Sequence, residues 1–363
     1  MASFDEVLKD CTKLGTKIPT SEYLENGKYP IIDQGQNDIA GYYDSDDGLF
    51  EDVPTIVFGD HTRVVKYVDK PCFLGADGVK LLCPLDKDIN CKYLFYQLSC
   101  ADIPNTGYNR HFKWVKALNF KIPSSDEQNH VVEVLDKVTE LISLRKQQLA
   151  KLDELVKARF VEMFGNIIRN DKSWPIHNFS DIASSRLGKM LDAKQQTGKY
   201  SYPYLANFNV QWFNFNMDNL NQMDFNEAEQ KEFELRDGDL LVCEGGEIGR
   251  CAVWHNEIQP CFFQKALHRV RCNRQLVQPD YLAWWFKYNC NHGGFAEIAG
   301  AKATIAHLPG IKLKQLQVAL PPLSLQNEFA AFVERVDQQK QTVQQSLEKL
   351  ELMKKALMQE YFG

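Results

Sequence analysis

Two long stretches of the chain carry an apolar residue at every seventh position and have no proline or glycine in their interior. A heptad stripe of this kind is buried when a partner helix packs on it. A helix of about 40 residues at ~1.5 Å per residue is ~60 Å long, well beyond an ordinary globular helix. The pattern therefore predicts two helices that pair with each other; the alternative is two amphipathic helices that each pack on their own domain. The unbroken stripes are Leu135, Ile142, Leu149, Val156 and Met163 in the first stretch and Phe329, Val336, Val343, Leu350 and Leu357 in the second.

These two stretches are copies of each other. Shifting the sequence by 198 residues superposes residues 123–165 on residues 321–363, with 13 identities in 43 positions. Each copy has proline and, within the next three residues, serine at its start and ends in Phe-Gly, and these residue types begin and end helices. In the first copy the identical positions are Pro123, Gln128, Asn129, Val138, Gln147, Leu149, Lys151, Leu152, Lys157, Ala158, Glu162, Phe164 and Gly165.

The segments ahead of the two helices show the same order of elements. Short β-branched and aromatic runs separated by turn residues predict strands, and a longer apolar run predicts a helix. After a linker at residues 166–177, Tyr-Pro-Ile-Ile at 29–32 has its echo in Tyr-Pro-Tyr-Leu at 202–205, and Gly107 with Phe112 matches Gly300 with Ile305. The first segment is expected to hold strands at residues 29–32, 55–58, 64–68 and 78–82 and a short helix at 92–98.

The repeats divide the chain into four parts in the order domain, helix, domain, helix. The domains are residues 1–122 and 166–320, and the helices are residues 123–165 and 321–363. Two similar helices and two diverged copies of one domain predict a pseudo-symmetric molecule.

Composition and charge narrow the class of protein. With 44% hydrophobic and 25% charged residues the chain is globular, and it has neither a membrane-length apolar run nor a signal sequence, so we expect a cytoplasmic protein without membrane contact. The net charge of −6 weakens the case for nucleic-acid binding but does not exclude it, because binding depends on a local basic face rather than on the total charge. None of the ten cysteines lies in a CxxC pair, which favours buried thiols over zinc or disulfides.

A search for catalytic motifs finds none that is complete. Residues 245–250, Gly-Gly-Glu-Ile-Gly-Arg, lack the Lys-Ser/Thr of a phosphate-binding loop and read as a turn between strands. The Pro321-Pro322 pair lacks the flanking residues of an adenine methyltransferase motif, and Pro279-Asp280 with Glu297 lacks the lysine of a metal-dependent nuclease. The eight histidines are scattered. We therefore expect no catalytic residue, metal site or cofactor on this chain.

Amide-rich loops with basic residues stand out instead, at matching points of both halves. Amides and arginine make paired hydrogen bonds to base edges, and lysine or threonine suits phosphates. For any single residue an ordinary solvated side chain is the alternative, whereas the matched set favours DNA binding. The candidates are Gln34, Gln36, Asn37, Arg63, Lys66, Asn109, Arg110, His111 and Lys113 in the first half and Lys189, Lys194, Asn207, Asn209, Arg250, Lys302, Thr304 and His307 in the second.

Over its whole length the chain resembles the specificity (S) subunit of a type I restriction-modification system. The resemblance rests on the Pro-to-Gln entries at residues 123–128 and 321–326, the long helices that end in Phe-Gly, and the paired domains. It implies an α+β fold with two similar α/β target-recognition domains, separated by two long helices that pair as an antiparallel coiled coil with pseudo-two-fold symmetry. Each domain is expected to read one half of a bipartite sequence in double-stranded DNA.

The resemblance also implies partners and cofactors. The helices would dock two methyltransferase (M) subunits, which bind S-adenosylmethionine, and restriction (R) subunits would use ATP and Mg²⁺. Two other functions stay open: a stand-alone DNA-modifying or DNA-cleaving enzyme with an unrecognised active site, and a structural coiled-coil scaffold. Incubating the purified chain with DNA and either Mg²⁺ or labelled S-adenosylmethionine separates the first of these from a specificity subunit, which would show no turnover.

Overall fold

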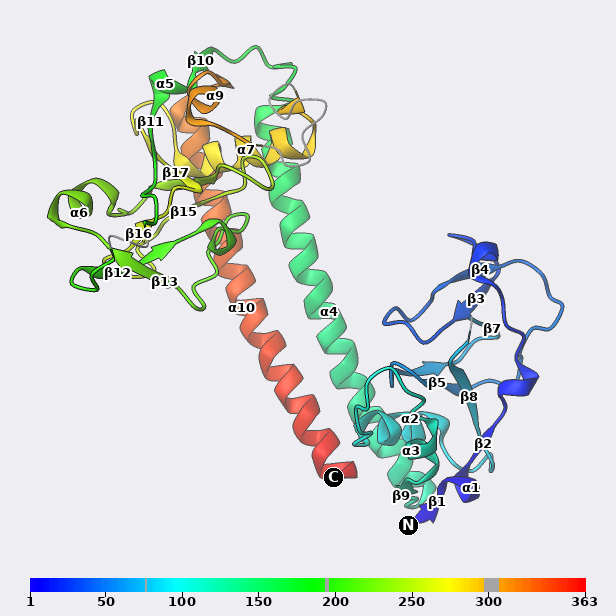
Figure 1. The fold of residues 1–363 in the computed structure, drawn as a ribbon. Coiled ribbons are helices and arrows are strands. Elements are labelled where there is room, and N and C mark those ends of the chain that lie inside the picture. Colours follow the sequence, from blue (N-terminus) through cyan, green and yellow to red (C-terminus); the bar gives the residue numbers. More distant parts are fainter. Residues whose placement is uncertain (76, 193–195, 297–306) are drawn as a thin grey trace. The chain divides into compact units, whose positions relative to one another are not determined.

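The computed structural model describes residues 1–75, 77–192, 196–296 and 307–363. The chain divides into two compact units (Figure 1). Unit 1 consists of Met1–Gln148 and Val343–Gly363, and unit 2 consists of Leu149–Thr342. Each unit therefore contains one domain, the first part of the helix that follows that domain, and the last part of the other long helix.

Both predicted long helices are present as single uninterrupted elements of 40 residues, α4 (Ser125–Phe164) and α10 (Leu323–Phe362). A reciprocal cap begins α4: the Ser124 backbone N–H donates to a Glu127 carboxylate oxygen at 3.0 Å, and the Ser124 hydroxyl accepts from the Glu127 N–H at 3.4 Å. Gly165 follows the helix with a φ of +72°, a left-handed conformation that favours glycine at a helix end.

Within each unit the two long helices pack on each other. In unit 1 Val131 and Leu135 of α4 cluster with Leu357 near the end of α10. In unit 2 Phe160, near the end of α4, packs on Phe329, near the start of α10. The first part of each helix thus lies against the last part of the other, which confirms the antiparallel pairing. Ion pairs cross between the helices at Lys146–Glu351 (3.0 Å), Asp153–Lys340 (2.6 Å) and Arg159–Glu328 (2.7 Å).

Two small sheets and a short ribbon form the domain of unit 1. Strand β5 is central and buried along its whole length, with Ile56 and Phe58 in one apolar cluster and Val57 in another. The four-stranded sheet has the order β2 (Leu8–Asp10), β8 (Val79–Pro84), β5 (Thr55–Gly59) and β6 (Val65–Val68). The three-stranded sheet has the order β4 (Gly41–Tyr43), β3 (Tyr29–Ile32) and β7 (Phe73–Leu74), and β1 (Ala2–Ser3) pairs with β9 (Asn119–Phe120).

Three helices complete this domain. Helix α2 (Cys91–Cys100) buries Leu94 and Leu98 in the same cluster as Ile56 and Phe58 of the central strand, and α1 (Phe4–Val7) and α3 (Phe112–Lys116) close its end. The strands and the helix predicted from the sequence all occur, with bounds that differ by at most two residues. Two 3₁₀ turns lie at Thr12–Leu14 and Thr20–Glu22.

Unit 2 repeats this topology strand for strand. Its β12 pairs in parallel with β16, as β3 pairs with β7, and all its other ladders are antiparallel. The four-stranded sheet has the order β11 (Ala183–Leu187), β17 (Leu267–Cys272), β14 (Leu240–Cys243) and β15 (Cys251–Val253). The three-stranded sheet has the order β13 (Asn221–Asp224), β12 (Ser201–Leu205) and β16 (Phe262–Phe263), and β10 (Ile176–Asn178) pairs with β18 (Gln317–Ala319).

The helices of unit 2 also repeat, and they correct one sequence match. Helices α5 (Phe179–Ile182), α7 (Pro279–Asn291) and α9 (Gly310–Lys314) correspond to α1, α2 and α3, while α6 (Glu227–Phe233) is an addition. Because α3 begins at Phe112 and α9 at Gly310, the offset of 198 residues extends back through these helices, and the match of Phe112 with Ile305 is wrong. Gly300 and Ile305 lie outside the described residues.

Aromatic rings join α4, α7 and α10 inside unit 2. The Phe160 ring is the centre of this cluster, with neighbouring ring centroids between 5.0 and 6.1 Å away. Such offset and edge contacts add to the burial of apolar area. Its neighbours are Phe164, Tyr281, Trp284, Tyr288 and Phe329.

A repeated glutamine anchors each long helix to its own domain. Buried Gln128 accepts from the backbone N–H of Asn90, the residue ahead of α2, at 2.9 Å and donates to the Pro123 carbonyl at 2.9 Å. Buried Gln326 makes the same two bonds, from the Gln278 N–H at 2.9 Å and to the Pro321 carbonyl at 2.7 Å. The repeated Pro-to-Gln entry is therefore a structural joint.

We expect Gln326→Met to destabilise unit 2. The substitution keeps the side-chain length but leaves the Gln278 N–H and the Pro321 carbonyl without this partner, which costs about 1–3 kcal/mol. Thermal unfolding followed by circular dichroism measures the loss. Exposed Gln339 in the same helix supplies the control, since Gln339→Met should change stability by no more than about 0.5 kcal/mol. If both substitutions lowered the stability equally, Gln326 would not be the residue that anchors the helix to its domain.

No helix among the described residues combines the length and the apolar character needed to span a bilayer.

Candidate nucleic-acid interface

In unit 1, loops that are far apart in the sequence meet at one end of the sheets. Gln34, after β3, accepts from the His61 backbone N–H at 3.2 Å and donates to the Asp77 carbonyl at 3.1 Å. The Thr62 hydroxyl donates to the Gln34 carbonyl at 2.7 Å. The loops after β3, after β5 and before β8 are thereby held together.

His111 ties a fourth loop to this group. Its backbone N–H and its Nδ1 both lie within 2.9 Å of the Asp60 carbonyl oxygen, which can only accept, so Nδ1 carries the proton. Nε2 is then free to accept from the Thr106 N–H at 3.3 Å. His111 is fully buried. The structure therefore gives His111, a candidate DNA contact, an internal role that shapes the loop at residues 102–110.

Two further candidates are used inside the domain. The side chain of Lys66 is buried and lies 3.2 Å from an Asp33 carboxylate oxygen, and it also donates to the Asn37 carbonyl. Arg63 has a φ of +62° and donates to the Ile103 carbonyl at 3.0 Å. The charged groups of Lys66 and Arg63 therefore hold the loops in place and are not available to a ligand. The Gln34 amide is also used in internal hydrogen bonds.

The side chains that remain exposed on these loops form the candidate interface of unit 1. Asn109 donates to the Thr106 carbonyl, which fixes the turn beside Arg110. Tyr108 is 87% exposed, and its ring stacks on that of His61 with centroids 4.6 Å apart, so it is a candidate that the search for amides and bases missed. The exposed candidates from the sequence are Gln36, Asn37, Asn109 and Arg110 on the loops and Lys113 in the first turn of α3.

Unit 2 brings the equivalent loops together. Asn207, after β12, donates to the Gly245 carbonyl at 2.8 Å, and the Arg250 guanidinium donates to the Asn207 carbonyl at 3.0 Å. Residues 244–250 form the turn between β14 and β15, as predicted. The Glu244 carbonyl accepts from the Leu308 N–H at 2.6 Å, which joins the segment ahead of α9 to this turn. The same three kinds of loop thus meet in both units.

Several candidates of unit 2 also have internal roles. Asn209 is fully buried, accepting from the Ala206 N–H and donating to the Asn216 carbonyl, both at 2.9 Å. Lys189 bonds the Asp224 carbonyl and a Glu229 carboxylate oxygen, each at 2.6 Å. Together with the bonds of Arg250 to Asn207, these contacts build the loops.

His307 is exposed beside Gly245 and is the sequence candidate of unit 2 that the structure leaves facing solvent among the described residues. Lys194, Lys302 and Thr304 lie outside the described residues. Phe208, between the two asparagines of its loop, is 53% exposed and was missed. As with Tyr108, aromatic rings were noted in these loops, but the sequence gives no signal that separates an exposed ring from a buried one.

The described residues contain no group of three or more histidine, cysteine or acidic side chains placed to hold a metal ion. All ten cysteines are free thiols. Burial raises the pKa of the Cys72 and Cys261 thiols, which stand directly before β7 and β16, to about 12. These two thiols stay protonated at neutral pH and are poor nucleophiles.

The fold and the loops define a protein with two copies of one loop-bearing domain and a pair of long antiparallel helices. The chain belongs to the type I restriction-modification specificity family: the family described as "Type I restriction modification DNA specificity domain" matches residues 5–154 and 171–352. This confirms the family identified from the sequence.

Individual relatives agree with this assignment. The chain is 23% identical over 195 residues to a putative type I restriction enzyme MjaX specificity subunit of Methanocaldococcus jannaschii, which covers 53% of this chain and 46% of the relative. It is 23% identical over 261 residues to a putative type I restriction enzyme specificity subunit of Haemophilus influenzae, covering 69% of this chain and 65% of the relative. The matched regions thus span about half to two thirds of these two relatives.

Solved structures share the fold. The S subunit of a type I restriction-modification system from M. genitalium superposes with a TM-score of 0.61 at 17% identity, over 99% of this chain and 95% of that one. A chain from a type I R-M system described for its complex assembly and conformational transition gives 0.57 at 14% identity, over 98% and 94%. The α+β fold with two repeated domains and a long helix pair is therefore confirmed.

Proposed function

We propose that this chain is the sequence-specificity subunit of a type I restriction-modification complex, in which each domain reads one half of a bipartite DNA target. The observation that carries the proposal is the repetition of the same loop assembly in both units. Two surfaces of the same construction but with different side chains suit two different half-sites. On such surfaces, exposed amides and arginine can contact base edges and lysine can contact phosphates. A single continuous target would need no such duplication.

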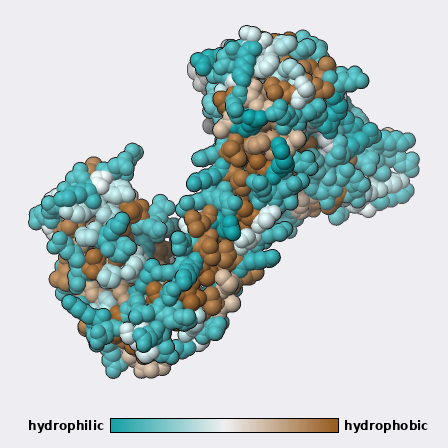
Figure 2. Space-filling view, turned by 180° about the vertical axis from the view of Figure 1, so that it is seen from behind, coloured by the Kyte–Doolittle hydropathy of each residue, from teal (hydrophilic) through white to brown (hydrophobic). Residues whose placement is uncertain are grey.

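The long helices supply a surface for methyltransferase subunits. Apolar side chains come to the surface along both helices, and even within the paired stripes Ile142, Leu149, Leu350 and Leu357 are only half-buried. Figure 2 shows exposed hydrophobic residues between hydrophilic surroundings. Exposed apolar residues that gather on one element mark an interaction site. The large apolar side chains that are exposed on the two helices are Leu141, Leu144, Leu155, Val161, Leu352 and Met353.

Catalysis then belongs to the partners. S-adenosylmethionine would bind the two M subunits, and ATP with Mg²⁺ would serve the R subunits. The assembled complex would be an adenine DNA methyltransferase and an ATP-dependent endonuclease, working in the cytoplasm. This chain contributes the choice of sequence and the spacing of the two half-sites.

Arg110→Ala is expected to affect one half-site only. Arg110 is exposed on the loop that His111 holds in place, and loss of one base contact by an arginine costs about 1–3 kcal/mol. The measurement is binding of the assembled complex to duplexes that are altered in one half-site at a time. Lys302→Ala, in the segment ahead of α9, should act on the other half. Equal losses of affinity at both half-sites, or no loss, would show that Arg110 does not read one half-site.

His111→Ala is the matched control for this test. It leaves the Asp60 carbonyl and the Thr106 N–H without their partner, so it should lower the thermal midpoint of the protein. Arg110→Ala should leave that midpoint unchanged, because the side chain is exposed. A specificity change with unchanged stability separates a reading residue from one that builds the loop.

A further inference from the structure

The equivalent ends of the two long helices differ in how far they are covered. In unit 2 Met163 and Phe164 at the end of α4 are buried, whereas in unit 1 their counterparts Tyr361 and Phe362 at the end of α10 are half-buried. The same difference holds for the segment that leads into the long helix of each unit. Lys121, Ile122 and Pro123 of unit 1 are half-buried, and their counterparts Ala319, Leu320 and Pro321 of unit 2 are buried.

The linker between the two halves covers this surface in unit 2. Ile167 is buried in the same apolar cluster as Phe164 and Leu320. The Trp174 indole N–H donates to the Phe164 carbonyl at 2.9 Å, and the Leu320 N–H donates to the Pro175 carbonyl at 2.8 Å. An aliphatic side chain and a tryptophan thus close the helix end.

A lysine of the linker caps the same helix. The Lys172 ammonium donates to the Glu162 carbonyl at 2.6 Å and to the Met163 carbonyl at 3.0 Å. A cation at these positions satisfies carbonyl groups that the last turn leaves without helical partners, and it complements the helix dipole. The linker therefore recognises the helix end by an aliphatic residue, a basic residue and an indole.

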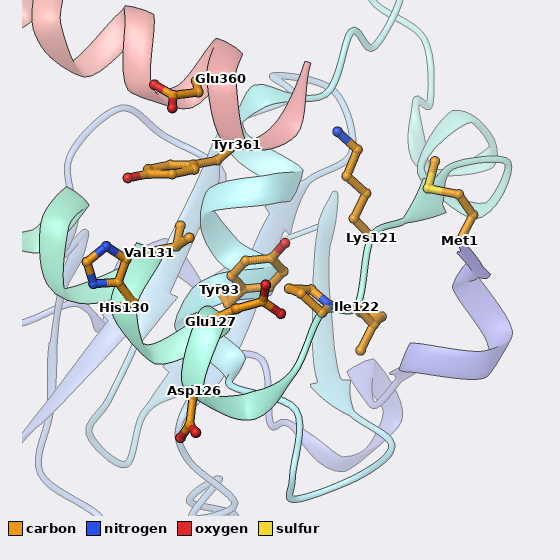
Figure 3. A pocket seen from close by; sticks show the side chains of 11 residues that line it. Met1, Tyr93, Lys121, Ile122, Asp126, Glu127, His130, Val131, Glu360 and Tyr361 are labelled. Carbon is orange, nitrogen blue, oxygen red and sulfur yellow. The ribbon is translucent and has the colours of Figure 1, made fainter.

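Unit 1 has a pocket of about 850 Å³ at the equivalent place. Figure 3 shows side chains from α4, from the segment before it and from the end of α10 around this hollow. Its apolar wall includes Ile122 and Val131, and Tyr93 and Tyr361 add aromatic rings. Among the described residues of unit 1, no segment covers this pocket as residues 166–175 cover the helix end in unit 2.

The charge of the pocket favours a basic occupant. Asp126, Glu127 and Glu360 line it, against Lys121 and His130. Lys121 already donates to the Gly363 carbonyl at 3.0 Å, so its charge lies at the helix end. The linker that occupies the equivalent place in unit 2 carries Arg169 and Lys172 against one acid, Asp171, between residues 166 and 175.

We propose that this pocket binds a short basic peptide segment of a partner protein, which presents an aliphatic residue, a lysine and a tryptophan in the order found in the linker. The segment would seat its aliphatic side chain and indole on Ile122, Val131 and Tyr361. Its lysine would donate to the last carbonyl groups of α10, as Lys172 does for α4. The partner would thereby attach at the end of the helix pair without touching the recognition loops.

A labelled peptide with the sequence of residues 166–178 tests the proposal against the full-length chain by fluorescence anisotropy. We expect saturable binding that weakens at least about tenfold when the peptide carries Trp174→Ala or the protein carries Tyr361→Ala. Glu360→Lys should also weaken binding, while Glu140→Lys, an exposed acid on α4 outside the pocket, should not. Equal losses from both charge reversals, or binding insensitive to Tyr361→Ala, would overturn the proposal.

A fusion of the peptide to the protein tests the proposal if the free peptide binds too weakly to be measured. Residues 166–178 are appended after Gly363, which raises the effective concentration of the segment to the millimolar range. Hydrogen exchange should slow at residues 360–363 and the thermal midpoint should rise, relative to a fusion in which Ile167→Asp and Trp174→Asp have been introduced into the appended copy. No difference between the two fusions, together with no binding in solution, would also overturn the proposal.

Discussion

Inserting one heptad into each of the two long helices is expected to lengthen the unread spacer of the DNA target by about 3 bp. Both helices are uninterrupted, and a heptad adds about 10 Å at ~1.5 Å per residue, close to three base-pair steps of ~3.4 Å. Whole heptads keep the apolar stripes continuous. An insertion after Leu149 in α4 lies between Lys146 and Asp153, so the matching insertion in α10 belongs between their partners Glu351 and Lys340.

The physical reason is that antiparallel helices act as a ruler when each connects one domain to the other. Two domains on one face of DNA sit about one helical turn apart, on the order of 10 bp. The insertion also turns the half-sites by nearly a third of a turn around the duplex, so methylation should be weaker. The half-sites themselves should stay unchanged in adenine-methylation sequencing.

An insertion into α4 alone is the control. It shifts one apolar stripe against the other, so it should lower the thermal midpoint and remove methylation. A double insertion that leaves the spacer length unaltered would show that the helices serve only for docking.

The isolated chain is expected to bind DNA weakly and without sequence preference. Its net charge is −6, and of the basic candidates in unit 1 only Arg110 and Lys113 are exposed. In unit 2 Lys189 and Arg250 are engaged within the domain. Few phosphate contacts give little affinity and a shallow salt dependence, because each contact contributes a slope of about −0.9 in log K against log salt.

Assembly with methyltransferase subunits should raise the specific affinity at least about a thousandfold and steepen the salt dependence, because the partners add phosphate contacts. Titrations of one duplex at several salt concentrations, with the chain alone and with the complex, give both quantities. A duplex with altered half-sites is the control for specificity. Tight sequence-specific binding by the isolated, monomeric chain would contradict the expectation.

The architecture was predictable from the sequence because its signals are periodic and repeated. The heptad stripes and the 198-residue repeat located both long helices, and alternating apolar runs located the strands of the first domain. The antiparallel orientation came from the family resemblance, and the packing of Leu135 with Leu357 confirms it. The matching of Phe112 with Ile305 failed because it rested on two residue types, whereas the register of α3 and α9 follows the helices.

The roles of single loop residues were not predictable in the same way. Lys66 pairs with Asp33, and His111 bonds to Asp60, across 33 and 51 residues of sequence. The sequence does not distinguish a basic loop residue that forms internal hydrogen bonds from one that faces solvent. Only the folded arrangement separates His111 from its exposed neighbour Arg110.

Adenine-methylation sequencing of DNA from cells that carry this chain with methyltransferase partners tests the central claim most directly. Two units with the same loop assembly predict one bipartite motif, in which two unlike half-sites flank a spacer of fixed length and free sequence. A single continuous motif, or methylation that is unchanged when this chain is deleted, would contradict the assignment of one half-site to each domain.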